Sequence, residues 1–309
     1  MRHFKKHLVA VLLLVLSFAS TAWAANQDFN TGKADYDRSD WDGAITNFSK
    51  SIMAGFDLDD SYSYRAFSEA EKGQSNAAIA DCNAVIKLNV NNAGGYYWRS
   101  QVEMDLTNYS AALTDFEMGV RLGPREKPQD LMEGLSSHYA HCAAREFREG
   151  NLNASVTNWN LAIFIDPTNG SFYEMRGWMR ELNGDSGRAM ADAYVAIKYM
   201  SNQPLAYLTR AFARYESDDA SGAMEDCDKV LEIYAKLREG VENPKKLTGL
   251  ESDPLIVEGL QNFINGDYKK TIQLWTDALK NFQEPPPPVK IYLQKWIEKA
   301  QSKLKEKTP

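Results

Sequence analysis

The amino-acid sequence predicts an all-α protein: a right-handed α-solenoid of about seven helix-turn-helix repeats followed by a C-terminal capping helix. Three observations support this prediction. A small residue returns every 34 residues, further small and apolar positions keep step with it, and glycines recur at a fixed place before it. A single helix pair cannot bury its own apolar face, so such pairs must stack in a row to form a continuous core.

One small or hydroxyl-bearing residue marks each repeat, and we call it the anchor. Successive anchors are separated by 34, 34, 43, 34, 34 and 48 residues, so insertions follow the third and sixth repeats while the period itself is kept. The seven anchors are Ala44, Ala78, Ala112, Ser155, Ala189, Ala223 and Thr271.

Other positions have the same period as the anchor. Twelve residues before it the residue is always small, which lets a second helix approach closely: Gly32, Ala66, Ser100, Ala143, Gly177, Ala211 and Gly259. Four repeats have a glycine five residues before the anchor, where a turn is expected: Gly73, Gly150, Gly184 and Gly266. Apolar residues one and eight positions after the anchor have helical spacing, so each repeat reads as two helices joined by a turn.

The first 24 residues are typical of an export signal. Arg2, Lys5 and Lys6 precede the apolar run from Leu8 to Ala19, and Ala22 and Ala24 suit cleavage after residue 24. We therefore expect an exported protein, periplasmic or secreted. An uncleaved signal that stays as a membrane anchor is the alternative.

The breaks in the period divide the remaining chain. Prolines and glycines near residues 124 and 244 cannot continue a helix, and Pro285 to Pro288 predict a short extended segment. The expected parts are a signal peptide at 1–24, repeats 1–3 at 25–124, an insertion at 125–135, repeats 4–6 at 136–237, a linker at 238–251, repeat 7 at 252–284, and a proline-rich segment with a basic capping helix at 285–309.

The charge of the chain argues against nucleic acid as a partner. The full sequence carries a formal charge of −7, and removal of the three basic residues of the signal leaves 32 Lys and Arg against 42 Asp and Glu, or −10. The last 21 residues are basic, with a balance of +4; we expect a solvated helix face there, and contact with an acidic partner is the alternative.

An Arg–Asp pair accompanies four of the repeats. The arginine lies thirteen residues before the anchor and the aspartate three after it, and the other three repeats lack both members. We therefore expect structural pairs between the two helices of a repeat: Arg65 with Asp81, Arg99 with Asp115, Arg176 with Asp192, and Arg210 with Asp226. The alternative is that these arginines form a row that binds an acidic ligand.

The period and these registers resemble the tetratricopeptide repeat family over nearly the whole mature chain. The run from Tyr62 to Ala66 with Ala78 to Asp81 is a close match, and so are Gly150, Ala162 to Pro167 and Gly177. The tyrosine that the family usually has nine residues before the anchor is absent, and Arg180 and Arg214 stand there in repeats 5 and 6.

The resemblance implies that the first helices line a concave wall that binds a protein partner. The implied wall is rich in aromatic side chains, which suits an extended peptide or a partner helix. Its expected members are Phe29, Lys33, Tyr36, Phe67, Tyr97, Gln101, Met104, Phe147, Trp178, Phe212 and Tyr215. Two alternatives stay open: these residues fill contacts inside the chain or are covered by its own terminal helix, or the wall stacks on the sugar rings of a cell-wall glycan.

The sequence favours a scaffold over an enzyme. His138, His141 and Cys142 lie close together on one helix, but no third or fourth metal ligand has suitable spacing. No nucleophile-elbow or phosphate-loop pattern is present, so we expect no catalytic residue, metal or cofactor. Cys82, Cys142 and Cys227 are too far apart in the array to pair, so three buried thiols are expected.

Overall fold

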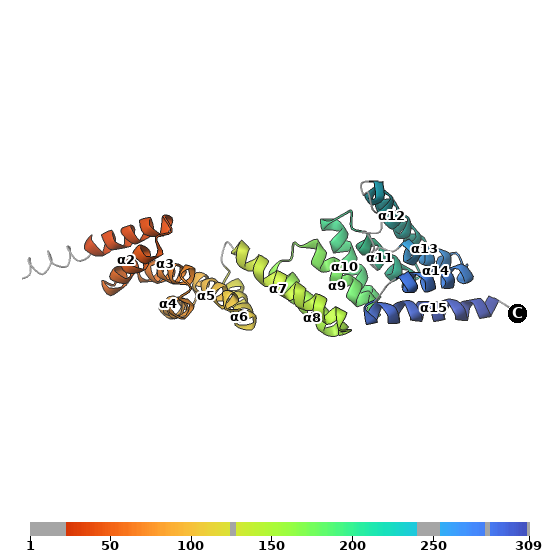
Figure 1. Ribbon diagram of the computed structural model, residues 1–309, viewed down its shortest axis with the longest axis horizontal. Coiled ribbons are helices and arrows are strands. Elements are labelled where there is room, and N and C mark those ends of the chain that lie inside the picture. Colours follow the sequence, from red (N-terminus) through yellow and green to blue (C-terminus); the bar gives the residue numbers. More distant parts are fainter. Residues whose placement is uncertain (1–22, 124–127, 240–253, 282–284, 308–309) are drawn as a thin grey trace, which may run out of the picture. The chain divides into compact units, whose positions relative to one another are not determined.

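The computed structural model describes residues 23–123, 128–239, 254–281 and 285–307. The regular structure in these ranges is helical (Figure 1). The chain divides into two compact parts, which we call the N-terminal body (residues 1–135) and the C-terminal body (136–309); the division falls inside α7. Residues 1–22 of the predicted signal, residues 124–127 at the first insertion and residues 240–253 at the expected linker lie outside the described residues, whereas the predicted cleavage site after Ala24 lies within a described helix at 23–37.

Consecutive helices pair in chain order, which confirms the predicted fold class. Residues 23–37 form a helix that precedes α2 (Trp41–Met53). The following pairs are α3 (Leu58–Glu71) with α4 (Ser75–Leu88), α5 (Ala93–Asp105) with α6 (Tyr109–Arg121), α7 (Gln129–Arg148) with α8 (Leu152–Ile165), α9 (Gly170–Leu182) with α10 (Ser186–Tyr199), α11 (Pro204–Glu216) with α12 (Ala220–Glu239), and α13 (Pro254–Ile264) with α14 (Tyr268–Asn281). The last helix is α15 (Pro287–Lys307).

The anchors lie in the packed interior of their repeats. All seven are 0% exposed. Where the anchor carries a hydroxyl, this group bonds to the backbone of the first helix: Ser155 Oγ donates to the Ala143 carbonyl at 2.9 Å. A Cβ on Gly259 would lie 2.2 Å from Nε1 of Trp275, so only glycine fits there. Small residues thus allow the helix contact on which each repeat depends.

The turn between the helices of a repeat has one left-handed residue, five positions before each anchor. Gly73, Gly150, Gly184 and Gly266 hold φ between 73° and 89°. The other three repeats place Ser39, Thr107 and Asp218 there, with φ of 59°, 61° and 63°. This conformation is costly for a residue that has a Cβ, so these three turns are strained.

The structure places each of the four arginines against the expected aspartate. Nε and Nη2 of Arg65 donate to Asp81 at 2.7 and 2.8 Å, and Nη1 donates to Ser49 of the preceding repeat at 2.9 Å. Arg99 and Arg176 likewise reach Asn83 and Asn160 of the preceding repeat. Each of these guanidinium groups therefore joins two repeats, and its donors are committed inside the chain.

The arginines that replace the family's usual tyrosine have a structural role. Nη1 of Arg180 donates to Asp192 at 2.6 Å, and Nη1 of Arg214 donates to Asp226 at 3.0 Å. In repeats 5 and 6 two guanidinium groups thus share one buried carboxylate, which balances the desolvation of that carboxylate with two charge-assisted bonds.

Three boundaries differ from the sequence-based expectation. Helix α15 begins at Pro287, so Pro287 and Pro288 lie in its first turn and not in an extended segment. Proline is favoured there because the first turn of a helix needs no backbone donor. Helix α7 begins at Gln129, inside the expected insertion, and α12 continues to Glu239. Within the described residues, no helix has both the length and the apolar character to cross a membrane.

Candidate partner-binding groove

Three positions on each of two first helices of the N-terminal body face a common surface. They are the positions fourteen, eleven and seven residues before the anchor, which have i, i+3, i+7 spacing and therefore share a helix face. Helices α3 and α5 contribute them: Tyr64, Phe67 and Glu71 from α3, and Trp98, Gln101 and Asp105 from α5.

Aromatic rings form a continuous row across this surface, which we call the aromatic row. The ring centroids lie 5.7 Å apart between Trp41 and Tyr36, 5.2 Å between Tyr36 and Phe67, and 5.3 Å between Phe67 and Trp98, and all three contacts are edge-on. Trp98 at the end of the row is 37% exposed. Such contacts fix the rings, so the row offers apolar area with little side-chain entropy left to lose on binding.

Two cavities meet at Phe67 and Trp98. The first, of about 390 Å³, is lined by residues of α3 and α5, including Ala70 and Val102, and by Pro128 before α7. The second, of about 450 Å³, lies over Tyr36, Ser63 and Tyr64. We call the two cavities and the rings between them the N-terminal groove.

The charged side chains that line the N-terminal groove are acidic. They are Asp59, Asp60, Glu71, Asp105 and Asp130, and within the described residues no lysine or arginine lines either cavity. Burial, followed by repulsion from neighbouring aspartates, raises the pKa of Asp60. The groove therefore combines an apolar floor with a negative rim, which favours a ligand that is both apolar and cationic.

The predicted wall residues of the N-terminal body divide into three groups. Tyr36, Phe67 and Gln101 line the N-terminal groove. Lys33 is half-buried, with Nζ 5.5 Å from the centre of the Tyr64 ring, and half-buried Met104 packs against Gly134 of α7.

Phe29 and Tyr97 differ from the expectation. They are 7% and 4% exposed, and they pack in the core against Phe48 and Phe116 respectively. Both lie fifteen residues before the anchor, a position that points between helices and not onto the open surface. Phe147 of α7, in the C-terminal body, is half-buried.

In the C-terminal body the corresponding surface is covered by α15. Trp178 and Phe212 are 2% and 0% exposed, and both contact Tyr292 of α15. Trp296 packs on Phe212 and on half-buried Tyr215, with centroids 5.3 and 5.7 Å apart. The alternative that the terminal helix covers the wall therefore holds here: α15 packs on α14 of the last pair, as a capping helix does, and it also covers these residues of the first helices.

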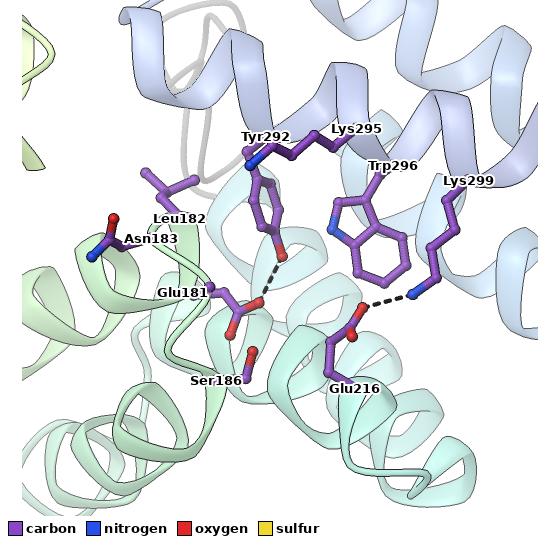
Figure 2. A pocket seen from close by; sticks show the side chains of 10 residues that line it. Glu181, Leu182, Asn183, Ser186, Glu216, Tyr292, Lys295, Trp296 and Lys299 are labelled. Carbon is purple, nitrogen blue, oxygen red and sulfur yellow. Dashed lines mark hydrogen bonds and ion pairs between the residues drawn. The ribbon is translucent and has the colours of Figure 1, made fainter.

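Polar contacts add to this apolar docking (Figure 2). The Tyr292 hydroxyl donates to Oε1 of Glu181 at 2.8 Å, and Nζ of Lys299 donates to Oε1 of Glu216 at 2.8 Å. Glu181 is 1% exposed, and this burial raises the pKa of its carboxyl to about 7. A cavity of about 240 Å³ adjoins these residues, between α9, α11 and α15.

The histidines and cysteines do not form a metal site in the described part of the chain, where no group of three or more His, Cys, Asp and Glu side chains could hold an ion. Sγ of Cys142 lies 3.5 Å from Nε2 of His138, and Cys142 is half-buried, not buried as expected. Cys82 and Cys227 are buried, and burial raises the pKa of Cys82 to about 12.

Sequence reasoning missed Trp98, Glu71 and Asp105 on the open side, and Tyr292 and Trp296 on the covered side. The open set has a detectable signal, because each member directly follows a residue at a position that the family resemblance suggested. Tyr292 and Trp296 have no equivalent within the repeats, so no register could have placed them.

No model of a known protein family matches the chain, and no curated protein sequence matches it. Solved structures share its fold. A chain in the structure of Naa15/Naa10 bound to HypK-THB is 11% identical, with a TM-score of 0.50 over 90% of this chain and 39% of that one. The C-terminal part of a TPR repeat-containing protein from Cytophaga hutchinsonii is 17% identical, with a TM-score of 0.43 over 85% of this chain and 98% of that one.

YrrB, described as a TPR protein with an unusual peptide-binding site, is 17% identical, with a TM-score of 0.35 over 60% of this chain and 91% of that one. At 11% identity and a TM-score of 0.50, the likeness to the chain in the Naa15/Naa10 structure concerns the fold alone. With its helices paired in consecutive 34-residue repeats, the chain is an all-α solenoid of the tetratricopeptide type.

Proposed function

We propose that this chain is a non-enzymatic scaffold that binds a protein partner through the N-terminal groove. Tetratricopeptide domains act as protein–protein interaction scaffolds, and one observation directs this role to the N-terminal body. The aromatic row ends in an exposed tryptophan between two cavities, whereas the same surface of the C-terminal body is covered by α15.

The proposed role includes export to the periplasm or the extracellular space. The support is the basic, apolar and small-residue order of residues 1–24. The partner would then be another protein of that compartment, bound as an extended peptide or as a helix.

The proposal is tested with a photo-crosslinking amino acid at position 98, introduced into the full chain in its own compartment. Position 88 provides a matched control, because Leu88 is also an exposed apolar residue of the N-terminal body but lies on a second helix, α4. We expect protein adducts from position 98 and none from position 88. Adducts from both positions in equal yield, or from neither, would contradict the proposal.

A glycan ligand is distinguished by a second measurement on the purified chain. Trp98→Ala should weaken partner binding about tenfold or more, because a rigid aromatic residue at the centre of an interface typically dominates its affinity. Leu88→Ala should leave it unchanged. Retention of cell-wall glycan by the native chain, lost in Trp98→Ala without any effect on protein partners, would instead assign the groove to sugar.

A further inference from the structure

The contacts of α15 show which kind of helix this solenoid accepts on its first helices. Tyr292, Trp296 and Lys299 are spaced i, i+4, i+7, so they share one face of α15. The two rings pack on Trp178 and Phe212, and the lysine bonds to Glu216 while its Nζ lies 4.3 Å from the centre of the Trp296 ring. An aromatic pair followed by one cation therefore forms the part of α15 that contacts α9 and α11.

The residues that receive this face have equivalents in the N-terminal groove. Trp178 and Phe212 lie eleven residues before their anchors, where α3 and α5 have Phe67 and Gln101. Glu216 lies seven residues before its anchor, and the same position holds Glu71 on α3 and Asp105 on α5. Both of these carboxylates line the first cavity of the groove. The open surface thus repeats the acidic register on both α3 and α5, and the aromatic register on α3.

We propose that the ligand of the N-terminal groove is a basic amphipathic helix of another protein, with aromatic side chains at i and i+4 and a lysine or arginine at i+7. This inference rests on the proposed function and specifies its partner. The aromatic side chains enter the two cavities on either side of the Phe67–Trp98 pair, and the cation meets Glu71 or Asp105.

Charge and shape both favour this ligand over an acidic or purely apolar one. Five carboxylates surround the cavities, and they attract a cationic helix and repel an acidic segment. A lysine in the groove would also lie near the ring of Trp98, as Lys299 lies near the ring of Trp296. An apolar helix without basic residues would partly desolvate these carboxylates without giving them a cationic partner, which opposes its binding.

The test uses a synthetic peptide of residues 287–307, the sequence of α15, as the probe against the full chain. The resident α15 already occupies the C-terminal surface, so binding of the free peptide reports the open groove. By fluorescence anisotropy we expect saturable binding that weakens about tenfold or more with Trp98→Ala. The double variant Glu71→Gln, Asp105→Asn should weaken it severalfold and flatten its dependence on salt.

Matched controls distinguish binding in the N-terminal groove from non-specific binding of the peptide. Leu88→Ala in the full chain should leave binding unchanged. Glu216 has the register of Glu71 but belongs to the covered surface, so a loss with Glu216→Gln would mean exchange with the resident helix and would overturn the assignment. A peptide of the same composition in scrambled order, and one with Tyr292→Ala and Trp296→Ala, should bind at least about tenfold more weakly.

The outcomes distinguish the ligand from the function. If an acidic or an extended peptide binds in a Trp98-dependent way and the α15 peptide does not, the helix assignment is wrong while the scaffold role stands. If no peptide binds and position 98 gives no adducts in its compartment, both are wrong. If sedimentation shows Trp98-dependent self-association of the full chain, the occupant is a second copy of this chain, and the assignment to another protein is overturned.

Discussion

Replacement of Trp296 by alanine is predicted to release α15 from the C-terminal body. Its indole is 4% exposed and packs against four rings of the repeats, Phe212, Tyr215, Phe263 and Trp275, with centroids between 5.2 and 5.9 Å away. Truncation of a buried tryptophan typically costs about 3–5 kcal/mol. We expect a loss near the upper end, because the same change removes several aromatic contacts at once.

Amide hydrogen exchange combined with urea unfolding measures this loss. In Trp296→Ala we expect faster exchange throughout α15 and in the stretches of α9 and α11 that carry Trp178 and Phe212. Ile291→Ala provides the control, since Ile291 lies on the same helix but is 53% exposed and should change stability by less than about 0.5 kcal/mol. A loss below about 1 kcal/mol with unchanged exchange in α11 would refute the docking described here.

Three further predictions concern charges and turns. Burial raises the pKa of Glu181 to about 7, so the folded state binds this proton more tightly than the unfolded state does. Protonation of Glu181 therefore stabilises the folded state fully below pH 4.5, and this contribution is lost as the pH rises through 7. The free energy of unfolding should fall by on the order of 3 kcal/mol over this range. In Glu181→Gln the free energy of unfolding, measured by urea between pH 4 and 8, should depend less on pH. An unaltered pH dependence would contradict the raised pKa of Glu181. In a double-mutant cycle with Arg99→Met and Asp115→Leu, the coupling free energy should be at least about 1 kcal/mol, and strictly additive losses would show that the pair does not interact energetically. Thr107→Gly should raise the free energy of unfolding by about 0.5–1 kcal/mol because glycine tolerates the left-handed turn, whereas Gly73→Ala should lower it by a similar amount. Thermal unfolding measures both changes. Changes of the same sign would rule out backbone strain as the explanation.

The helix pairs and their internal contacts could be predicted because the same residue types recur at equivalent positions in each repeat. One small residue at Ala66 alone means little, but the same choice in seven repeats identifies a helix contact. The Arg–Asp pairs could be predicted for the same reason, since the positions of Arg65 and Asp81 hold arginine and aspartate together in four repeats and neither residue in the other three. The strained turns at Ser39, Thr107 and Asp218 were hidden, because the signal sought there was glycine.

The candidate site was less predictable than the fold. Wall positions transferred from the family resemblance included the register of Phe29 and Tyr97, which lies one residue from that of Trp98. One residue rotates a side chain by about 100° on a helix, enough to move it from an open surface into the core. Covering of Trp178 and Phe212 depends on a long-range contact with Tyr292, and no local pattern in the sequence encodes such a contact.

The arginine contacts also bear on how the length of such an array can change. Arg65 and Arg99 each bond to an aspartate sixteen residues ahead and to a polar residue sixteen residues behind. Excision of residues 66–99 would leave Arg65 with Asp115 ahead and Ser49 still behind. No charge would be stranded at the splice, so duplication or loss of a whole repeat is a step that this architecture tolerates, whereas a shift by a few residues would break the network on both sides.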